Sequence, residues 1–387
     1  MPAPLWRWGA AVAAAALLAS CGSGSSDTAT AGDSAPPTTA SETSSGSTSG
    51  STGPASTTSP SGAPTTGSPS HPVVLTPART ILSWRPVPGS TKDLVTVGDR
   101  STLTVLPGGA SARLTGPHPL TINAGDHSSI TDALLDDDYA LVVSEDRFAH
   151  DPDRATVVDL ATGHTTILDA DSEPPTVVGG TWALGPHTLV HATSGSRHRY
   201  CLATVDLPDG SGSTGWCAAP RNGFRGAVVT DAGTTMMTFD DHHPSCRVLN
   251  DVDGARLRPL AGVTPCKGWD SALLDGTRIW SVVPNEHRID AAHFYAQTPG
   301  GWYDLGPGTS GSLVACAASA FFTRDPQSRT DPATLLRWDP GAASLSVAFA
   351  TRATGNAFLS PPRCGGTDLT VTAYSQAGDE QVTAPLG

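Results

Sequence analysis

A two-hairpin unit recurs along the chain after residue 73, and this repeat restricts the fold more than any other feature of the sequence. The first half of the unit is an apolar strand, a tight turn and a second apolar strand, as in DALLDDDYALVVS from Asp132. The second half is a strand ending near Asp or Pro, a glycine turn and a further strand, as in LLRWDPGAASLSV from Leu335. The units begin near residues 80, 130, 176, 225, 268, 311 and 356, a spacing of about 43 to 50 residues.

Four strands per unit at this period are typical of the blades of a β-propeller, whereas β-sandwiches do not repeat at a fixed period. The sequence therefore predicts an all-β, seven-bladed β-propeller over residues 73–387. The last unit has room for only three strands, so we expect the spare strand at 73–77 to complete the last blade and remove two exposed edges. Six blades with irregular ends are the alternative.

The first 20 residues have the pattern of a secretory signal peptide. Arg7 precedes an apolar stretch from Gly9 to Ala19, which is too short to span a membrane. The following Leu-Ala-Ser-Cys sequence resembles the lipobox of bacterial lipoproteins, which implies that Cys21 becomes the mature N-terminus and carries a diacylglycerol. A two-chain anchor of this kind holds a protein stably on a membrane. An ordinary signal peptide with an incidental cysteine is the alternative.

Residues 21–72 combine this cysteine with a low-complexity segment. Of the 51 residues from Gly22 to Pro72, 47 are Ser, Thr, Gly, Pro or Ala, so the segment cannot bury enough apolar surface to order itself. We expect a disordered tether that holds the folded part on the extracytoplasmic face of the cell membrane. The signal, the tether and the near absence of lysine resemble lipoproteins of GC-rich Gram-positive (actinobacterial-type) bacteria.

The charge of the chain limits its partners. The net charge is −13, from 36 acidic and 23 basic residues, which argues against nucleic acid as a partner. The expected partners are the membrane, through Cys21, and a protein or glycan of the cell envelope. We expect the folded part to be a monomer.

Residues 73–387 resemble bacterial propellers of the TolB-like, YVTN and WD-repeat types. Trp338-Asp339 stands where a WD dipeptide would, at the end of the third strand of a unit. The Gly-His dipeptide of WD repeats and the Ser-Pro-Asp-Gly turn of TolB-like repeats are both absent from the sequence. The resemblance therefore implies an architecture and carries no function with it.

Six cysteines remain after Cys21, and an exported chain is expected to pair them, although sequence alone leaves about 15 pairings. The repeat narrows the choice, because the start of the third strand in an antiparallel hairpin lies beside the end of the fourth. This predicts Cys201–Cys217 and Cys246–Cys266. Cys316 and Cys364 then remain, near the ends of neighbouring innermost strands, where they would join the last two blades.

Ligand sites in propellers usually lie at one mouth of the central channel. Here the connections between second and third strands are long and polar, and loops that lead from one unit to the next, such as 116–129 and 220–226, lie on the same face. The turns within each hairpin are short, so we expect binding on the long-loop face. The candidate binding residues are His198, Arg221, Arg225, His242, His243 and Trp269.

Several chemical sites are not predicted. Adjacent residues on an extended chain point opposite ways, so His242 and His243 make a poor metal chelate. The run Asp136–Asp138 lacks the alternating ligands of a calcium loop and is interpreted as turn chemistry. The sequence has no recognisable nucleophile elbow, metalloprotease or nucleotide-binding motif. We therefore name no catalytic residue, metal or cofactor.

The leading functional hypothesis from sequence is a binding or scaffold module for a cell-envelope protein or glycan. The alternative is an extracytoplasmic enzyme, a hydrolase, lyase or quinoprotein-like protein, with its site at the channel mouth. The two differ in one structural requirement. An enzyme needs a titratable cluster on the inner strands and the adjoining loops, whereas a binding module can spread its contacts around the rim.

Overall fold

The structure is a computed structural model that describes residues 71–79, 82–285 and 287–386. These residues belong to one unit, which spans Thr66–Gly387. The predicted signal peptide, Cys21 and the tether lie outside the described residues, apart from His71 and Pro72. In the described part, the regular elements are β-strands and two single 3₁₀ turns, η1 (Pro107–Gly109) and η2 (Ser196–His198). No helix in this part is long and apolar enough to cross a membrane.

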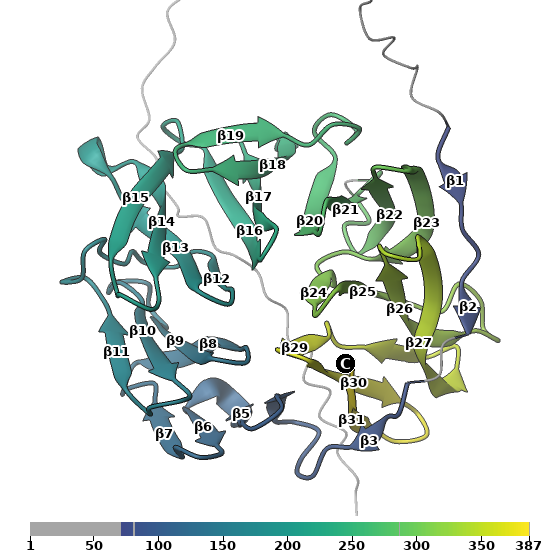
Figure 1. The fold of residues 1–387 in the computed structure, drawn as a ribbon, viewed down its shortest axis with the longest axis horizontal. Coiled ribbons are helices and arrows are strands. Elements are labelled where there is room, and N and C mark those ends of the chain that lie inside the picture. The colour runs from purple at the N-terminus through teal and green to yellow at the C-terminus, as the bar shows by residue number, and fades with distance from the viewer. Residues whose placement is uncertain (1–70, 80–81, 286, 387) are drawn as a thin grey trace, which may run out of the picture. The chain divides into compact units, whose positions relative to one another are not determined.

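Five sheets of four or five strands and one larger sheet together form a ring (Figure 1). The first contains β4 (Leu94–Val97), β5 (Thr102–Val105), β6 (Ser111–Thr115) and β7 (Leu120–Asn123). The second contains β12 (Trp182–Leu184), β13 (Thr188–Ser194), β14 (Tyr200–Asp206) and β15 (Gly212–Cys217). The third contains β16 (Gly223–Thr230), β17 (Gly233–Phe239), β18 (Arg247–Asp253) and β19 (Arg256–Pro259). The fourth contains β20 (Gly268–Leu274), β21 (Thr277–Val282), β22 (Ala291–Thr298), β23 (Gly301–Thr309) and β1 (Val73–Val74). The fifth contains β24 (Val314–Cys316), β25 (Ser319–Arg324), β26 (Pro332–Asp339), β27 (Ser344–Thr354) and β2 (Ala78–Arg79).

The other nine strands form one sheet in two halves. One half contains β8 (Ser128–Leu135), β9 (Tyr139–Asp146), β10 (Arg154–Asp159) and β11 (Thr165–Leu168). The other contains β28 (Ala357–Leu359), β29 (Arg363–Gly365), β30 (Asp368–Ser375), β31 (Glu380–Pro385) and β3 (Arg85–Pro86). A single parallel pair, Gly365 with Leu135, joins them. The fold is therefore all-β and propeller-like, but it has five separate blade-sized sheets where the sequence predicted seven blades or, alternatively, six.

The N-terminal segment of the folded part runs along the outer edges of three sheets, and this corrects the expectation for residues 73–77. β1 pairs in parallel with β23, β2 pairs in parallel with β27, and only β3 pairs with β31 beside the last group of strands. The strand that completes the last group is thus Arg85–Pro86 and not the segment at 73–77. Sequence could not distinguish these outcomes, because every outer strand offers a similar row of unpaired backbone groups.

The first predicted unit is also displaced. Its innermost strand begins at Leu94 and not near residue 80, and the hairpin from Thr102 forms the second and third strands of the sheet. The segment 116–129, which was predicted to be a loop, contains β7. In that segment only Leu120 and Ile122 show the alternation of apolar residues that is typical of a strand, so the sequence pattern is short. The segment forms a strand because it pairs with β6.

The core lies between adjacent sheets, because each sheet buries both of its faces. On β25, Phe322 belongs to one apolar cluster with Phe294 and Trp338, whereas its neighbour Phe321 belongs to the next cluster with Leu335. The rings of Phe294 and Phe322 stack with their centroids 4.0 Å apart. The strand tryptophans serve this packing; Trp280 and Trp338 are fully buried.

The structure contains three disulfide bonds, and they are the three pairs that the repeat predicted: Cys201–Cys217, Cys246–Cys266 and Cys316–Cys364. The first lies within one sheet, between β14 and β15, and the second joins the residue before β18 to the connection between β19 and β20. The third joins β24 to β29, so it crosses from the fifth sheet to the last strand group.

We expect the double variant Cys316→Ser/Cys364→Ser to lose about 4 kcal/mol of unfolding free energy, and Cys201→Ser/Cys217→Ser to lose about 3 kcal/mol. The difference arises because these bonds close segments of 48 and 16 residues, respectively. Urea unfolding followed by tryptophan fluorescence measures both losses. A smaller loss for the pair that joins two strand groups would contradict the assigned role of that bond in holding the ring together.

Candidate functional site

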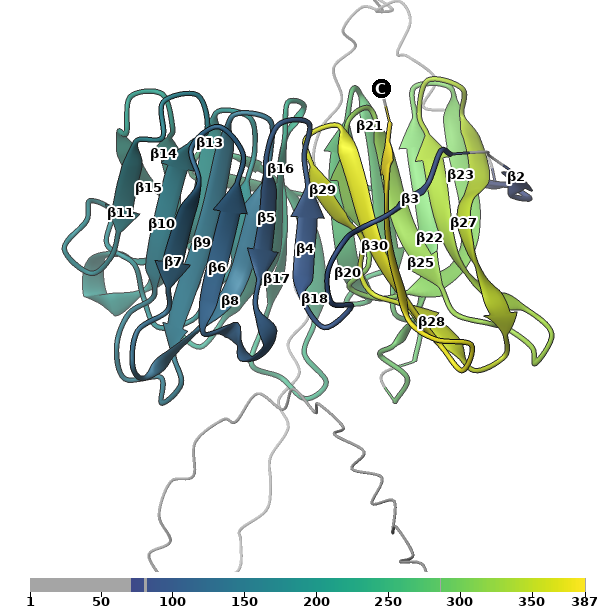
Figure 2. The same ribbon diagram turned by 90° about the horizontal axis from the view of Figure 1, so that it is seen from below.

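The strand connections gather on two opposite faces of the ring (Figure 2). The long-loop face carries the connections between second and third strands and those that lead from one sheet to the next. The turn face carries the remaining, shorter connections, such as the β8–β9 turn. We keep these two names below.

The structure brings together two of the six predicted binding residues on the long-loop side. The guanidinium carbon of Arg225, on β16, lies 4.7 Å from the centre of the Trp269 ring on β20. Arg247, at the start of β18, lies 4.9 Å from the same ring centre. Sequence reasoning missed Arg247, because its place beside Trp269 depends on the packing of two sheets. A guanidinium group over the face of an indole ring is attracted to the ring's π-electrons. Arg225, Arg247 and Trp269 therefore form a cation–π cluster.

The other four predicted residues lie on exposed connections and do not converge with this cluster into one group. Arg221 forms an ion pair of 2.6 Å with Asp241, and the Nδ1 atom of His242 lies 2.7 Å from Asp240. The hydrogen bond to Asp240 raises the pKa of His242. His243 is an exposed neighbour of His242, and His198 belongs to η2 on a different connection.

Asp270 follows Trp269 at a β-bulge, where β20 carries one extra residue relative to β21. Its Oδ2 atom accepts hydrogen bonds from the Ser281 hydroxyl and the Gly311 amide, both at 2.9 Å. Burial raises the pKa of Asp270 to about 6, and the nearby charge of Arg225 opposes this shift. The bulge thus adds a buried carboxyl group beside the cation–π cluster, and no motif in the sequence indicated it.

A second titratable group, which we call the carboxylate cluster, consists of Asp132, Glu145 and Asp153. Asp132 lies on the innermost strand β8, Glu145 on β9, and Asp153 just before β10. Asp153 is 1% exposed and is fixed by two hydrogen bonds: its Oδ1 accepts from the Gly179 amide at 2.9 Å, and its Oδ2 accepts from Trp182 Nε1 at 3.1 Å. Asp132 and Glu145 are only partly buried, so solvent reaches them.

Burial and mutual repulsion shift the ionisation of this cluster. Burial, with smaller contributions from the charges of Glu145 and then Asp153, raises the pKa of Asp132 to about 6. Burial also raises the pKa of Glu145, with a smaller contribution from Asp153. Tyr200 lies close enough to be affected, and burial raises its pKa to about 12. A carboxyl group that titrates near neutral pH can exchange protons with a substrate.

Sequence reasoning missed the carboxylate cluster because its members lie in segments that were interpreted as a strand and a solvated loop. The only usable signal was Asp132, a charged residue at the start of a strongly apolar innermost strand. Its proximity to Asp153 follows from the way β9 and β10 fold back beside β8.

No group of three or more His, Cys, Asp or Glu side chains in the described ranges has an arrangement suited to a metal ion.

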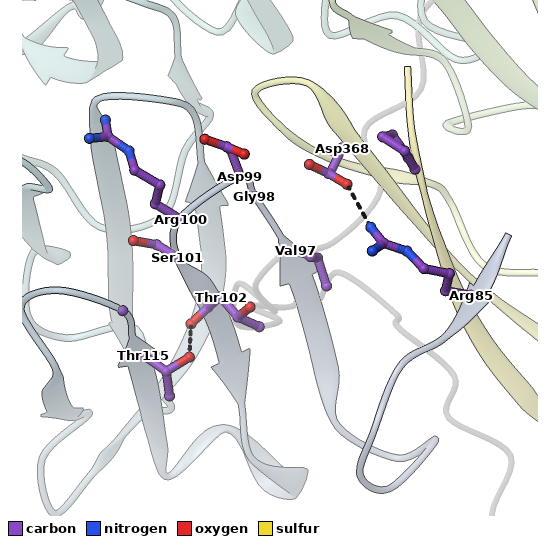
Figure 3. Close-up of a pocket in the computed structure, with 11 residues that line it drawn as sticks. Arg85, Val97, Gly98, Asp99, Arg100, Ser101, Thr102, Thr115 and Asp368 are labelled. Atoms are coloured by element: carbon purple, nitrogen blue, oxygen red, sulfur yellow. Dashed lines mark hydrogen bonds and ion pairs between the residues drawn. The ribbon is translucent and has the colours of Figure 1, made fainter. Parts of the chain in front are cut away.

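A hollow of about 490 Å³ opens on the turn face, opposite the predicted binding face (Figure 3). We call it the turn-face hollow. An adjoining space of about 270 Å³ shares the β4–β5 turn with it and reaches Asp136 and Asp137. The polar residues that line the hollow are Arg85, Asp99, Arg100, Ser101, Thr115 and Asp368. Sequence reasoning assigned no site to this face, because its short turns gave no signal.

We expect Asp132→Asn to stabilise the protein more at pH 7.5 than at pH 4.5. The raised pKa of Asp132 means that the native state favours its protonated form, so the wild type loses stability as the pH rises from about 4 through about 6. An asparagine removes that loss. Urea unfolding at both pH values measures the effect, with Asp231→Asn, on an exposed turn, as the control. An equal change at the two pH values would contradict the assigned ionisation.

Comparisons with known proteins bear on the fold. No protein-family model matches the chain, and no curated protein matches it. Among solved structures, it is similar to a prolyl endopeptidase with a TM-score of 0.52 and 12% identity; the match covers 76% of this chain and 46% of that chain. The β-propeller domain of the Trilobed protease from Pyrococcus furiosus gives a TM-score of 0.43 and 8% identity, over 67% of this chain and 83% of that one. An oligogalacturonate lyase from Vibrio parahaemolyticus gives a TM-score of 0.44 and 10% identity, and the match covers 80% of this chain and 98% of that one. The chain thus spans less than half of the endopeptidase, and the likeness shows a propeller-like fold alone.

Proposed function

We propose that this protein is an extracytoplasmic β-propeller enzyme, a hydrolase or lyase, that uses the carboxylate cluster for acid–base chemistry. The observation that carries the proposal is the position of Asp132 on an innermost strand, beside Glu145, with a pKa raised to about 6. This is the titratable cluster on an inner strand that the enzyme alternative requires. The peptidase and lyase names of the similar structures belong to those proteins and add nothing to this argument.

The two partly buried carboxyl groups take different roles. Asp132, whose pKa is raised to about 6, acts as the general acid, and Glu145, whose pKa burial also raises, acts as the general base. Asp153 accepts hydrogen bonds from Trp182 and Gly179, and its negative charge acts on both Asp132 and Glu145. Hydrolases and lyases both need one group that gives a proton and one that takes it.

We further propose seven blades. The nine-stranded sheet divides into a half with β8–β11 and a half with β28, β29, β30, β31 and β3, and a single residue pair joins the two halves. Counting each half as a blade gives the number that the repeat predicted. In this arrangement β3 supplies the outer strand of the last blade and closes the ring.

The proposal keeps the cellular location that the sequence predicts. Residues 1–20 are the signal peptide, Cys21 carries the lipid, residues 21–72 form the tether, and residues 73–387 form the propeller. The protein is then anchored to the cell membrane on its extracytoplasmic face. The support is the lipobox-like sequence and the composition of the tether.

A second candidate function is binding of a cell-envelope protein or glycan by the long-loop face, without catalysis. The observation in its favour is the cation–π cluster of Arg225, Arg247 and Trp269. Arginine and tryptophan are the residues that most often dominate binding energy at interfaces. The two candidates are separated by turnover.

We expect the purified protein to turn over at least one member of a panel of envelope polysaccharides, chromogenic glycosides and esters. The rate should fall as the pH rises, with a midpoint near pH 6, because Asp132 must be protonated to act as the acid. Asp132→Asn should lower kcat by 100-fold or more, within the ~10²–10⁴-fold range of acid–base catalysis, and the control Asp231→Asn should not. Absence of turnover across the panel would leave the binding function in its place, and full activity of Asp132→Asn would contradict its role as the acid.

We expect Cys21→Ser to abolish incorporation of labelled fatty acid and to release the protein from the membrane fraction. The thiol is the group that forms the thioether, and serine cannot replace it. Metabolic labelling and cell fractionation test this, with Cys201→Ser/Cys217→Ser as the control for cysteine loss in general. Labelling that persists in Cys21→Ser would remove the lipid anchor from the proposal.

A further inference from the structure

The turn-face hollow contains charged groups of both signs that come from three separated stretches of chain. Arg85 lies on β3, Asp99 on the β4–β5 turn, and Asp368 at the start of β30. Figure 3 shows Asp99 and Asp368 on either side of a gap, with Arg85 beside Asp368 and the Arg100 side chain directed away from them. Two carboxylates and one guanidinium group therefore surround the same space.

The charges in this space are incompletely paired. Nη2 of Arg85 and Oδ1 of Asp368 are 3.9 Å apart, which is longer than a hydrogen-bonded ion pair, and the Arg85 side chain is 66% exposed. Asp99 adds a second negative charge, and its repulsion contributes to the raised pKa of Asp368, after the larger effect of burial. A positive group between the two carboxylates would relieve this repulsion, and a negative group could bind Arg85 at the same time.

The walls of the hollow are held by close backbone contacts. A Cβ atom on Gly98 would lie 2.9 Å from the carbonyl oxygen of Gly365, and one on Gly116 would lie 2.7 Å from the carbonyl oxygen of Arg100. These glycines let the β4–β5 turn pack directly against its neighbours on both sides. The separation of the backbone at Asp99 and Asp368 is therefore set by close packing, because Gly365 is paired with Asp368 in the β29–β30 hairpin.

We propose that the turn-face hollow binds a small zwitterion of the α-amino acid class, with its ammonium group between Asp99 and Asp368 and its carboxylate on Arg85. In such a ligand the two charged groups are attached to one carbon, which matches a carboxylate and a guanidinium group held 3.9 Å apart. A hollow of about 490 Å³ has room for an amino acid or a short peptide end. Nearby hydroxyl groups on Ser101 and Thr115 can contact the rest of the ligand.

This site is independent of the proposed enzyme function, because it lies on the opposite face. Isothermal titration of the full-length protein with glycine, L-alanine, L-lysine and glycylglycine tests it, with methylamine and acetate as probes that carry one charge only. We expect the zwitterions to bind at least tenfold more tightly than either single-charge probe. Arg85→Gln and Asp99→Asn should each weaken zwitterion binding tenfold or more.

The control variant is Asp253→Asn/Arg258→Gln, which removes an exposed ion pair of 2.6 Å on the third sheet. Arg85 and Asp99 are exposed, so their variants should fold, and thermal unfolding checks this. Binding of glycylglycine but not of free amino acids would overturn the proposal, because the ammonium and carboxylate groups of the dipeptide are attached to different carbons. Equal affinity for methylamine and glycine, unchanged binding in both variants, or no binding of any zwitterion would each overturn it.

Discussion

Every sheet in the ring must bury both of its faces, and the rest of the structure depends on this constraint. On β9, Leu141 and Val143 pack toward the sheet that begins with Trp182, while Ala140 and Val142 pack toward the sheet that contains Leu103. A strand that is buried on both sides has a continuous run of apolar residues, and the hairpins of the repeat have this pattern. Since each sheet is covered only by its neighbours, no sheet is stable alone and the ring has to close.

Closure occurs where the chain is least regular. The strap formed by β1, β2 and β3 covers the outer edges of three successive strand groups, Cys316–Cys364 joins two of them, and one backbone pair at Gly365 links the last group to β8. The glycines at this point allow turns from different groups to touch, and the turn-face hollow lies among them. The close packing that joins two strand groups into one sheet therefore also places charged residues of both signs around the turn-face hollow.

Burial between sheets also explains the chemistry of the long-loop face. Polar side chains at the ends of innermost strands are partly withdrawn from water, which raises the pKa of carboxyl groups such as Asp132 and Asp270. A bulge at Asp270 and a second one between Ile130 and Asp132 shift these residues out of the regular alternation. Buried acids are therefore placed by irregularities of the inner strands, whereas the histidines of the loops stay exposed.

The sequence by itself determined the repeat, the all-β class and the three cysteine pairs, because all of these depend on local alternation or on equivalent positions in a repeat. It also identified Arg225 and Trp269 as members of one region. Only the tertiary structure decided that Arg85–Pro86 is the strand beside β31, that Arg247 joins Trp269, and that Asp132, Glu145 and Asp153 form one cluster. The physical reason is that these contacts join segments whose separation is set by how neighbouring sheets twist and pack. No period along the chain encodes that geometry.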